Sequence, residues 1–155
     1  MSLERMPELG TKLVTLSVKL PHGKKADQDR VGKGLRALYA SGDFTDVEII
    51  CSEKSYSAHR AVLAGQSDIF KEGFSANTSE NKGRHEVRIA DISNPEAVKF
   101  MLDYMYEMTT DVWEDYNPGT QEINKDVLRL AQNFRLPGLA EHATLWLPEE
   151  NNTGN

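Results

Sequence analysis

The segment that begins at Asn94 places the strongest constraint on the fold, because it reads as a helix that is apolar on nearly every side. Its apolar residues follow the helical i, i+3, i+4, i+7 spacing and are widened by two aromatic residues: Val98, Phe100, Met101, Leu102, Tyr104 and Met105. Asn94-Pro95-Glu96 supplies a helix start, with a capping side chain, a proline in the first turn and an acid near the positive end of the helix dipole. A helix this apolar is stable only inside a core. The rest of the chain must therefore fold around it.

Strand and helix patterns are interleaved along the remaining sequence. Alternating apolar residues predict four strands, of which the second and third form a hairpin: 13–20, 46–51, 55–58 and 85–90. Helical spacing predicts six helices: 31–41, 59–64, 68–74, 94–105, 127–134 and 137–146. Gly65 is expected to end the second helix, and Ser67 is expected to cap the third. Ser75–Arg84 is expected to form a loop, and 107–122 an irregular acidic segment.

The composition suits one self-sufficient domain. The chain has 155 residues and a formal charge of −6, from 18 Lys and Arg against 24 Asp and Glu. Its single cysteine, Cys51, excludes an internal disulfide framework, and no run approaches the roughly 18 apolar residues of a membrane span. The acidic balance argues against general nucleic-acid binding, and the first ten residues lack the apolar region of a secretory signal. We therefore expect an intracellular protein, cytoplasmic or nuclear, that binds neither membranes nor nucleic acids.

No arrangement of residues indicates catalysis. None of the four histidines stands at metal-ligand spacing from another ligand: His22, His59, His85 and His142. Cys51 alternates with Ile49 on a predicted strand, which is typical of a small core residue, and His142 lies on the apolar face of the last helix, as a hydrogen-bonded core histidine would. We expect no catalytic residue, no metal, no cofactor and no small-molecule substrate.

The acidic segment 107–122 leaves two alternatives open. It contains Glu114-Asp115 but no histidine, arginine or glycine framework for acid–base chemistry, so a metal-binding or hydrolytic protein is a remote alternative. The segment also carries Trp113 and Tyr116, and aromatic residues of this kind recur at the energetic centres of protein interfaces. These two side chains are therefore candidate contacts to a partner protein.

Three motifs in fixed order are more specific. Phe44-Thr45-Asp46-Val47 precedes the hairpin, Ala58-His59-Arg60-Ala61-Val62-Leu63-Ala64 follows it, and Ser67-x-x-Phe70-x-x-x-Phe74 comes next. In these motifs the sequence resembles the BTB/POZ family, and the resemblance covers about residues 31–147. It implies an α+β fold in which a cluster of helices is flanked by a small three-stranded sheet, with an additional N-terminal strand. It also implies three regions: an N-terminal segment 1–30 with the strand at 13–20, the domain at 31–147, and a flexible tail at 148–155.

The resemblance implies a role in protein–protein assembly without catalysis. Many family members form homodimers through the first helix of the domain and the strand before it, and recruit partner proteins that this sequence does not identify. The corresponding residues here are the candidate dimer interface: Val14, Leu16, Val18, Leu35 and Leu38. The acidic connection 107–122 is longer than usual and resembles that of fungal members.

Asp46 and Arg60 match the positions that form a charged pocket near the dimer interface in related domains. One interpretation is that the two side chains are buried together, in which case loss of either would leave an uncompensated charge. The alternative is that they pair within one subunit and only brace the fold. His59, which belongs to the same motif, is expected to be an architectural hydrogen-bonding residue.

A second functional hypothesis is a substrate adaptor that links a cullin-based ubiquitin ligase to its target. Family members that bind cullins often carry a hydrophobic-x-Glu element in the loop after the second phenylalanine of the third motif. That loop follows Phe74 here and contains Glu80, but Thr78 occupies the place of the apolar residue. Phe74 and Glu80 are therefore candidate contacts to a partner, and the departure at Thr78 weakens the cullin hypothesis.

Overall fold

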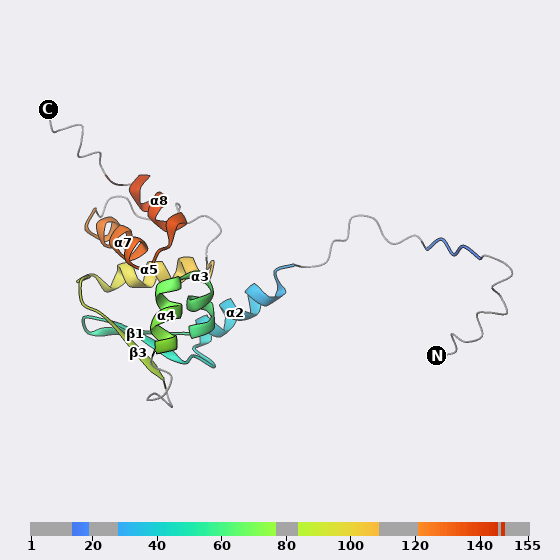
Figure 1. The fold of residues 1–155 in the computed structure, drawn as a ribbon, viewed down its shortest axis with the longest axis horizontal. Coiled ribbons are helices and arrows are strands. Elements are labelled where there is room, and N and C mark those ends of the chain that lie inside the picture. The colour runs from blue at the N-terminus through green and yellow to red at the C-terminus, as the bar shows by residue number, and fades with distance from the viewer. Residues whose placement is uncertain (1–13, 19–27, 77–83, 109–120, 146, 148–155) are drawn as a thin grey trace.

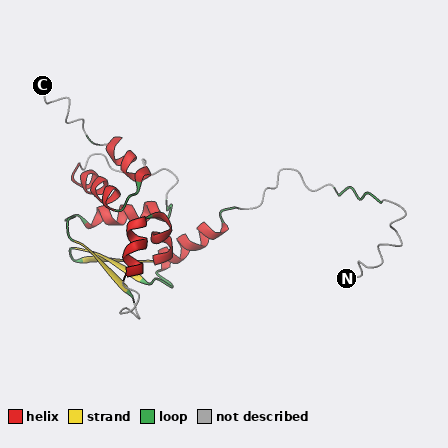
Figure 2. Cartoon of the chain, viewed as in Figure 1, coloured by secondary structure: helices red, strands yellow, loops and turns green. Residues whose placement is uncertain are grey.

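The computed structural model describes residues 14–18, 28–76, 84–108, 121–145 and 147. Within these ranges the chain forms a helical cluster with a small mixed sheet along one side (Figures 1 and 2). The order of elements is α2, β1, β2, α3, α4, β3, α5, α7 and α8. From α2 onward this order agrees with the one predicted from the sequence patterns, and it gives an α+β fold.

The sheet has three strands in the order β2-β1-β3. β1 (Val47–Cys51) pairs antiparallel with β2 (Lys54–Ala58), as the predicted hairpin requires, and parallel with β3 (His85–Ile89). Buried residues alternate along β1 with less buried ones, so one face of the sheet lies against the helices. The parallel β1–β3 pair is possible because α3 and α4 supply the long crossover that a parallel connection needs.

The helices are short, and local signals define several of their ends. Their bounds are α2 (Arg30–Ser41), α3 (Arg60–Gln66), α4 (Asp68–Ala76), α5 (Pro95–Met105), α7 (Gln121–Asn133) and α8 (Pro137–Leu145). α2 ends where Gly42 adopts the left-handed conformation and its N–H bonds the Leu38 carbonyl. Ser67 caps α4 as predicted, because its hydroxyl accepts the Phe70 N–H at 3.2 Å and donates to the Phe134 carbonyl at 2.6 Å.

α5 lies in the centre of the core, as its all-round apolar pattern predicts. Five of its residues are buried: Ala97, Val98, Met101, Leu102 and Met105. α7 packs against both α5 and α8, and its buried Val127 and Leu130 join the same apolar cluster as Ile49 of β1. Cys51 is also buried in this cluster, and its thiol donates to the Ile92 carbonyl at 3.2 Å. Its predicted role as a core residue is confirmed.

Three local expectations need correction. Gly65 does not end the helix but lies inside α3, which continues through Gln66. α4 extends two residues into the predicted loop and ends at Ala76. Asn94 occupies the N-cap of α5 but makes no side-chain capping bond.

Within its described residues, the additional N-terminal strand does not form in the single chain. The described part of that segment, residues 14–18, belongs to no strand, and Val14, Leu16 and Val18 are all exposed. A strand exists only when a neighbour satisfies its backbone groups. The alternating pattern of this segment therefore indicates a strand only if something outside the described residues pairs with it.

Candidate functional site

The helix α2 is amphipathic, yet none of its residues is fully buried. Leu35 and Leu38 are half-buried, and Val31 is 76% exposed. An amphipathic helix normally covers its apolar stripe against a core. In α2 that stripe is only partly covered, so part of it remains an exposed apolar surface.

Tyr39 fastens the C-terminal half of α2 to the central helix. Its ring stacks on the ring of Tyr106 with 4.0 Å between centroids, and its hydroxyl donates to Asp103 Oδ1 at 2.8 Å. Lys99 Nζ donates to the same carboxylate at 2.7 Å. Burial, followed by the hydrogen bond and charge of Asp103, raises the pKa of Tyr39 far above its ordinary value. Tyr39 therefore stays neutral and remains a hydrogen-bond donor at any physiological pH.

Tyr106 connects this contact to His59. The Tyr106 hydroxyl accepts the His59 backbone N–H at 2.8 Å and lies 2.7 Å from His59 Nδ1. His59 Nε2 lies 2.9 Å from the Asp43 carbonyl oxygen, which can only accept, so Nε2 carries the proton and Nδ1 accepts from Tyr106. Burial raises the pKa of Tyr106 to about 12, although the bond from the His59 N–H acts in the opposite direction. His59 is thus the architectural hydrogen-bonding residue that its motif predicts.

Asp46 and Arg60 pair within one chain. Asp46 Oδ1 accepts the backbone N–H of Arg60 at 2.7 Å, and Oδ2 accepts from Arg60 Nε at 3.0 Å. The Asp46 and Arg60 side chains are 42% and 35% exposed in the single chain. Arg60 Nη1 also lies 2.7 Å from Nε2 of the buried His85. Because a guanidinium only donates, His85 Nε2 accepts this bond and carries no proton.

Opposing effects act on the Asp46 carboxyl. Its partial burial raises the pKa, whereas the two hydrogen bonds from Arg60, the Arg60 charge and the His59 interaction lower it. The lowering effects win, so the pKa of Asp46 lies below its ordinary value. Asp46 therefore links the residue before β1 to the first turn of α3 as a carboxylate at neutral pH.

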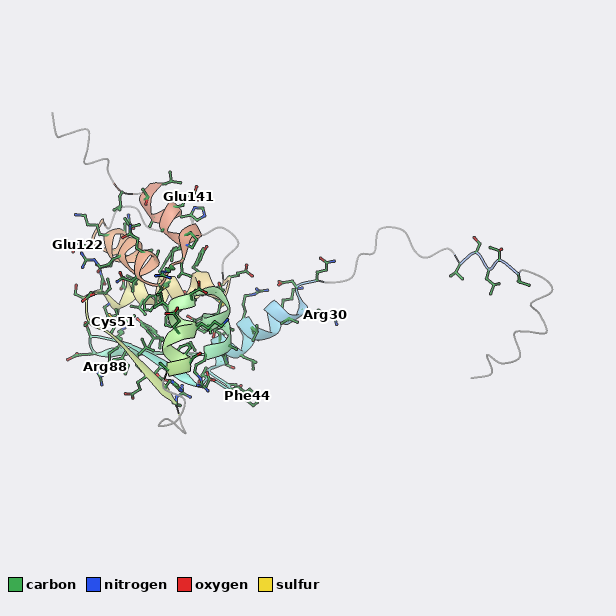
Figure 3. All side chains as sticks on the ribbon, in the orientation of Figure 1. Arg30, Phe44, Cys51, Arg88, Glu122 and Glu141 are labelled. Carbon is green, nitrogen blue, oxygen red and sulfur yellow. The ribbon has the colours of Figure 1, made fainter. Side chains whose placement is uncertain are left out.

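Phe44 projects from the turn between α2 and β1. It is 85% exposed, and its backbone φ of 60° lies in the left-handed region that bulky residues rarely adopt. Figure 3 shows Arg30 at one end of α2 and Phe44 beyond the other end. This aromatic ring therefore adds exposed apolar area just beyond the C-terminal end of α2. We call Val31, Leu35, Leu38 and Phe44 together the α2 surface.

Among the other residues predicted to contact partners, those that the structure describes are not brought together. Phe74 is buried and stacks with Phe70 at 5.6 Å between centroids, which places it in the core rather than on a binding surface. Glu80, Trp113 and Tyr116 lie outside the described residues, as does Thr78. Val14, Leu16 and Val18 are exposed but lie outside any strand, and the structure does not place them against the α2 surface.

Three features of this site do not follow from the sequence patterns alone. The helical spacing assigns Val31 to the first helix of the domain, and the first motif includes Phe44, but neither pattern indicates how far the side chain is exposed. The alternation that includes His85 predicts a strand but not the contact of His85 with Arg60. The exposure of the Phe44 side chain could not be predicted from the neighbouring residues, because it depends on the geometry of the turn that follows Gly42. The order His85-x-Val87 did not point to Arg60, which lies 25 positions earlier in the chain.

Among the described residues no group of three or more His, Cys, Asp and Glu side chains is placed to hold a metal ion. Helices long and apolar enough to cross a membrane are likewise absent from the described part of the chain. The described part of the site thus consists of an apolar helix surface, a projecting aromatic ring and a hydrogen-bonded charged pair.

Comparisons with known proteins agree with this architecture. The family described as BTB/POZ domain matches residues 35–150. An influenza virus NS1A-binding protein homolog of Xenopus laevis is 38% identical over 96 residues, which cover 59% of this chain and 15% of that protein. Kelch-like protein 41 of Mus musculus is 25% identical over 122 residues, which cover 79% of this chain and 19% of that protein.

Among solved structures, the BTB domain of zebrafish PATZ1 superimposes with a TM-score of 0.60 at 22% identity, over 81% of this chain and 95% of that chain. This likeness shows the fold. The chain spans less than a fifth of the length of the two curated relatives described above. Because the family match extends from Leu35 in α2 through the closing helices and covers most of the sequence, the chain belongs to the BTB/POZ domain family.

Proposed function

We propose that this chain is a non-catalytic interaction module that forms a homodimer through the α2 surface and recruits further proteins. The observation that carries the proposal is that α2 is amphipathic but has no buried residue. A helix of this kind gains most of its stability from covering its apolar stripe. A second copy offers the same stripe, so a two-fold contact would cover both stripes at once.

Two further observations support self-association. Phe44 adds a large exposed ring at the end of the α2 surface, and exposed aromatic residues are the usual anchors of interfaces. Val14, Leu16 and Val18 lie exposed in a segment with strand alternation and no strand partner. In a dimer this segment would gain a neighbour from the other copy. Membership of the BTB/POZ family fits a protein-interaction module.

Asp46 and Arg60 have a supporting role in this proposal. They hold the start of β1 and the start of α3 together close to the turn that carries Phe44. The charged pair would therefore keep the edge of the α2 surface in shape in each subunit. It would not need to contact the other subunit to affect dimer formation.

Sedimentation of the purified chain over a range of concentrations tests the proposal. A dimer that also orders the N-terminal segment should bury about 2,000 Å² or more. Val31→Asp and Phe44→Asp change exposed side chains and should convert the dimer to a folded monomer. Leu145→Asp is the matched control, because Leu145 is a comparably exposed apolar residue on α8. A wild-type chain that remains monomeric at every concentration contradicts the proposal.

A substrate adaptor of a cullin-based ubiquitin ligase is a second candidate. It is favoured by the similarity to Kelch-like protein 41, since adaptors of this class share the domain. The segment that would carry the contact, around Thr78 and Glu80, lies outside the described residues. Co-purification with a cullin N-terminal domain, and loss of that binding in Glu80→Ala, would support this role. Failure to co-purify under conditions that retain a known adaptor would reject it.

A further inference from the structure

We propose that the open edge of β3 is a second self-association surface, at which two copies of this chain pair their β3 strands antiparallel. β3 lies at one end of the sheet order β2-β1-β3, and no strand of the described residues pairs with its outer edge. An unpaired edge carries backbone donors and acceptors that another strand can satisfy. This surface is separate from the α2 surface and does not depend on it.

The ladder with β1 defines which groups of β3 point outward. The His85 N–H donates to the Asp46 carbonyl at 3.1 Å, so His85, Val87 and Ile89 direct their backbone groups toward β1. The intervening residues, Glu86 and Arg88, therefore direct their N–H and C=O groups toward the open edge. Their side chains are exposed on the outer face of the sheet.

These two residues make the edge complementary to itself. In an antiparallel pair of β3 strands centred on Val87, Glu86 of one copy lies opposite Arg88 of the other, and Arg88 lies opposite Glu86. Both positions present outward backbone groups, so each facing pair would exchange two backbone hydrogen bonds. Both positions also place opposite charges across the strands, which stabilises a cross-strand pair. The two-fold axis passes between the two Val87 residues, so one pair of Glu86 and Arg88 lies on each side of it.

The charges of Glu86 and Arg88 are available for this contact. Neither side chain forms an ion pair or a side-chain hydrogen bond with another described residue, whereas the neighbouring Arg84 already binds Glu48 and Thr45. Figure 3 shows Arg88 on the sheet side of the molecule, well separated from Phe44 of the α2 surface. Both surfaces could therefore be occupied at once.

The pairing would join two three-stranded sheets into one continuous six-stranded sheet. The contact is short, so it should be weak and should depend on concentration. Combined with a two-fold contact at the α2 surface, the β3 contact would link dimers into larger assemblies. Two different two-fold contacts on one chain can continue from copy to copy instead of ending in a closed dimer.

Charge reversal tests the proposal on exposed residues of the whole chain. Arg88→Glu and Glu86→Arg each place like charges opposite one another, and each should raise the dissociation constant of this contact by roughly ten-fold or more. The double variant Glu86→Arg/Arg88→Glu should restore association, because the charges are complementary again. An equimolar mixture of the two single variants should also associate, since every facing pair is then of opposite sign.

Sedimentation equilibrium at high protein concentration measures these differences, and circular dichroism melts verify that each variant stays folded. The series is repeated with Phe44→Asp, so that loss of the α2 contact and loss of the β3 contact are told apart. Equal association of the wild type and both single variants would overturn the proposal. So would a double variant that remains as dissociated as the single ones, or a wild type that shows no association beyond that removed by Phe44→Asp.

Discussion

Arg60 binds Asp46 at two points, with its backbone N–H at 2.7 Å from Oδ1 and its Nε at 3.0 Å from Oδ2. The carboxylate satisfies an N–H of the first turn of α3, which lacks an intrahelical partner, and also pairs with the guanidinium of the same residue. Since His59 at the N-cap makes no side-chain capping bond, Asp46 performs the capping from 14 residues away. The pair therefore joins the hairpin to the helix that follows it.

Replacing Asp46 should destabilise the fold. Asp46→Ala removes both acceptors and should lower the free energy of unfolding by about 1–2 kcal/mol, since the pair is partly exposed and the loss of a cap has this size. Asp46→Asn keeps one oxygen acceptor and should have a smaller effect. Urea denaturation measures both, with Glu141→Ala, an exposed residue of α8, as the control. Equal effects of Asp46→Ala and Glu141→Ala would contradict the role of the pair.

The contribution of Asp46 should depend on pH. Its pKa is lowered in the folded chain, so its stabilisation is complete above the unfolded value of about 3.9 and is lost as the pH falls through the lower folded value. The difference in unfolding free energy between the wild type and Asp46→Ala should therefore be constant near neutral pH and shrink below about pH 4. Denaturation curves recorded at a series of pH values measure it. A difference that grows on acidification would refute this linkage.

Tyr39 should decide how firmly α2 is held. Tyr39→Phe removes the hydrogen bond to Asp103 but keeps the stack on Tyr106, and should cost about 1 kcal/mol, because Lys99 still satisfies the carboxylate. Tyr39→Ala removes the stack as well and should cost about 3 kcal/mol. Amide hydrogen exchange should show faster exchange in α2 for the alanine variant than for the phenylalanine variant. Unchanged protection of α2 in both would argue against this anchoring role.

Phe44 should separate stability from association. Its φ of 60° is strained for a bulky residue but ordinary for glycine, so Phe44→Gly should leave the monomer as stable or up to about 1 kcal/mol more stable. The same change removes the exposed ring and should weaken the homodimer. Thermal melts at low concentration and sedimentation at high concentration measure the two effects. A variant that is both less stable and fully dimeric would show that the ring serves the fold instead.

Gly138 should tolerate no side chain without an adjustment of Tyr104. A Cβ at Gly138 would lie 2.5 Å from the Tyr104 hydroxyl, which is the end of a half-buried side chain. Gly138→Ala should therefore destabilise the contact between α8 and α5 by about 1 kcal/mol. Adding Tyr104→Phe removes the oxygen and should recover most of the loss. A double mutant as unstable as the sum of the single ones would place the cause elsewhere.

Several elements of the fold and part of the site were predictable because their signals are local. The alternation in Val47-x-Ile49-x-Cys51 and the apolar spacing of α5 depend only on which side chains must be buried within one element. Ser67 was predicted as a cap for the same reason, since its acceptor geometry spans three residues. The motifs that contain Asp46 and Arg60 indicated a charged pair but not how exposed its side chains are in the single chain.

The sequence by itself thus determined the type and order of the elements from α2 onward, and through its motifs the family. Only the tertiary structure decided the contacts between distant positions. It placed β3 parallel beside β1, stacked Tyr39 on Tyr106, brought His85 to Arg60 and left Phe44 exposed. The physical reason is that periodicity specifies which face of an element is buried but not which element covers it. That choice depends on how the whole chain closes around α5, where many weak contacts are satisfied together.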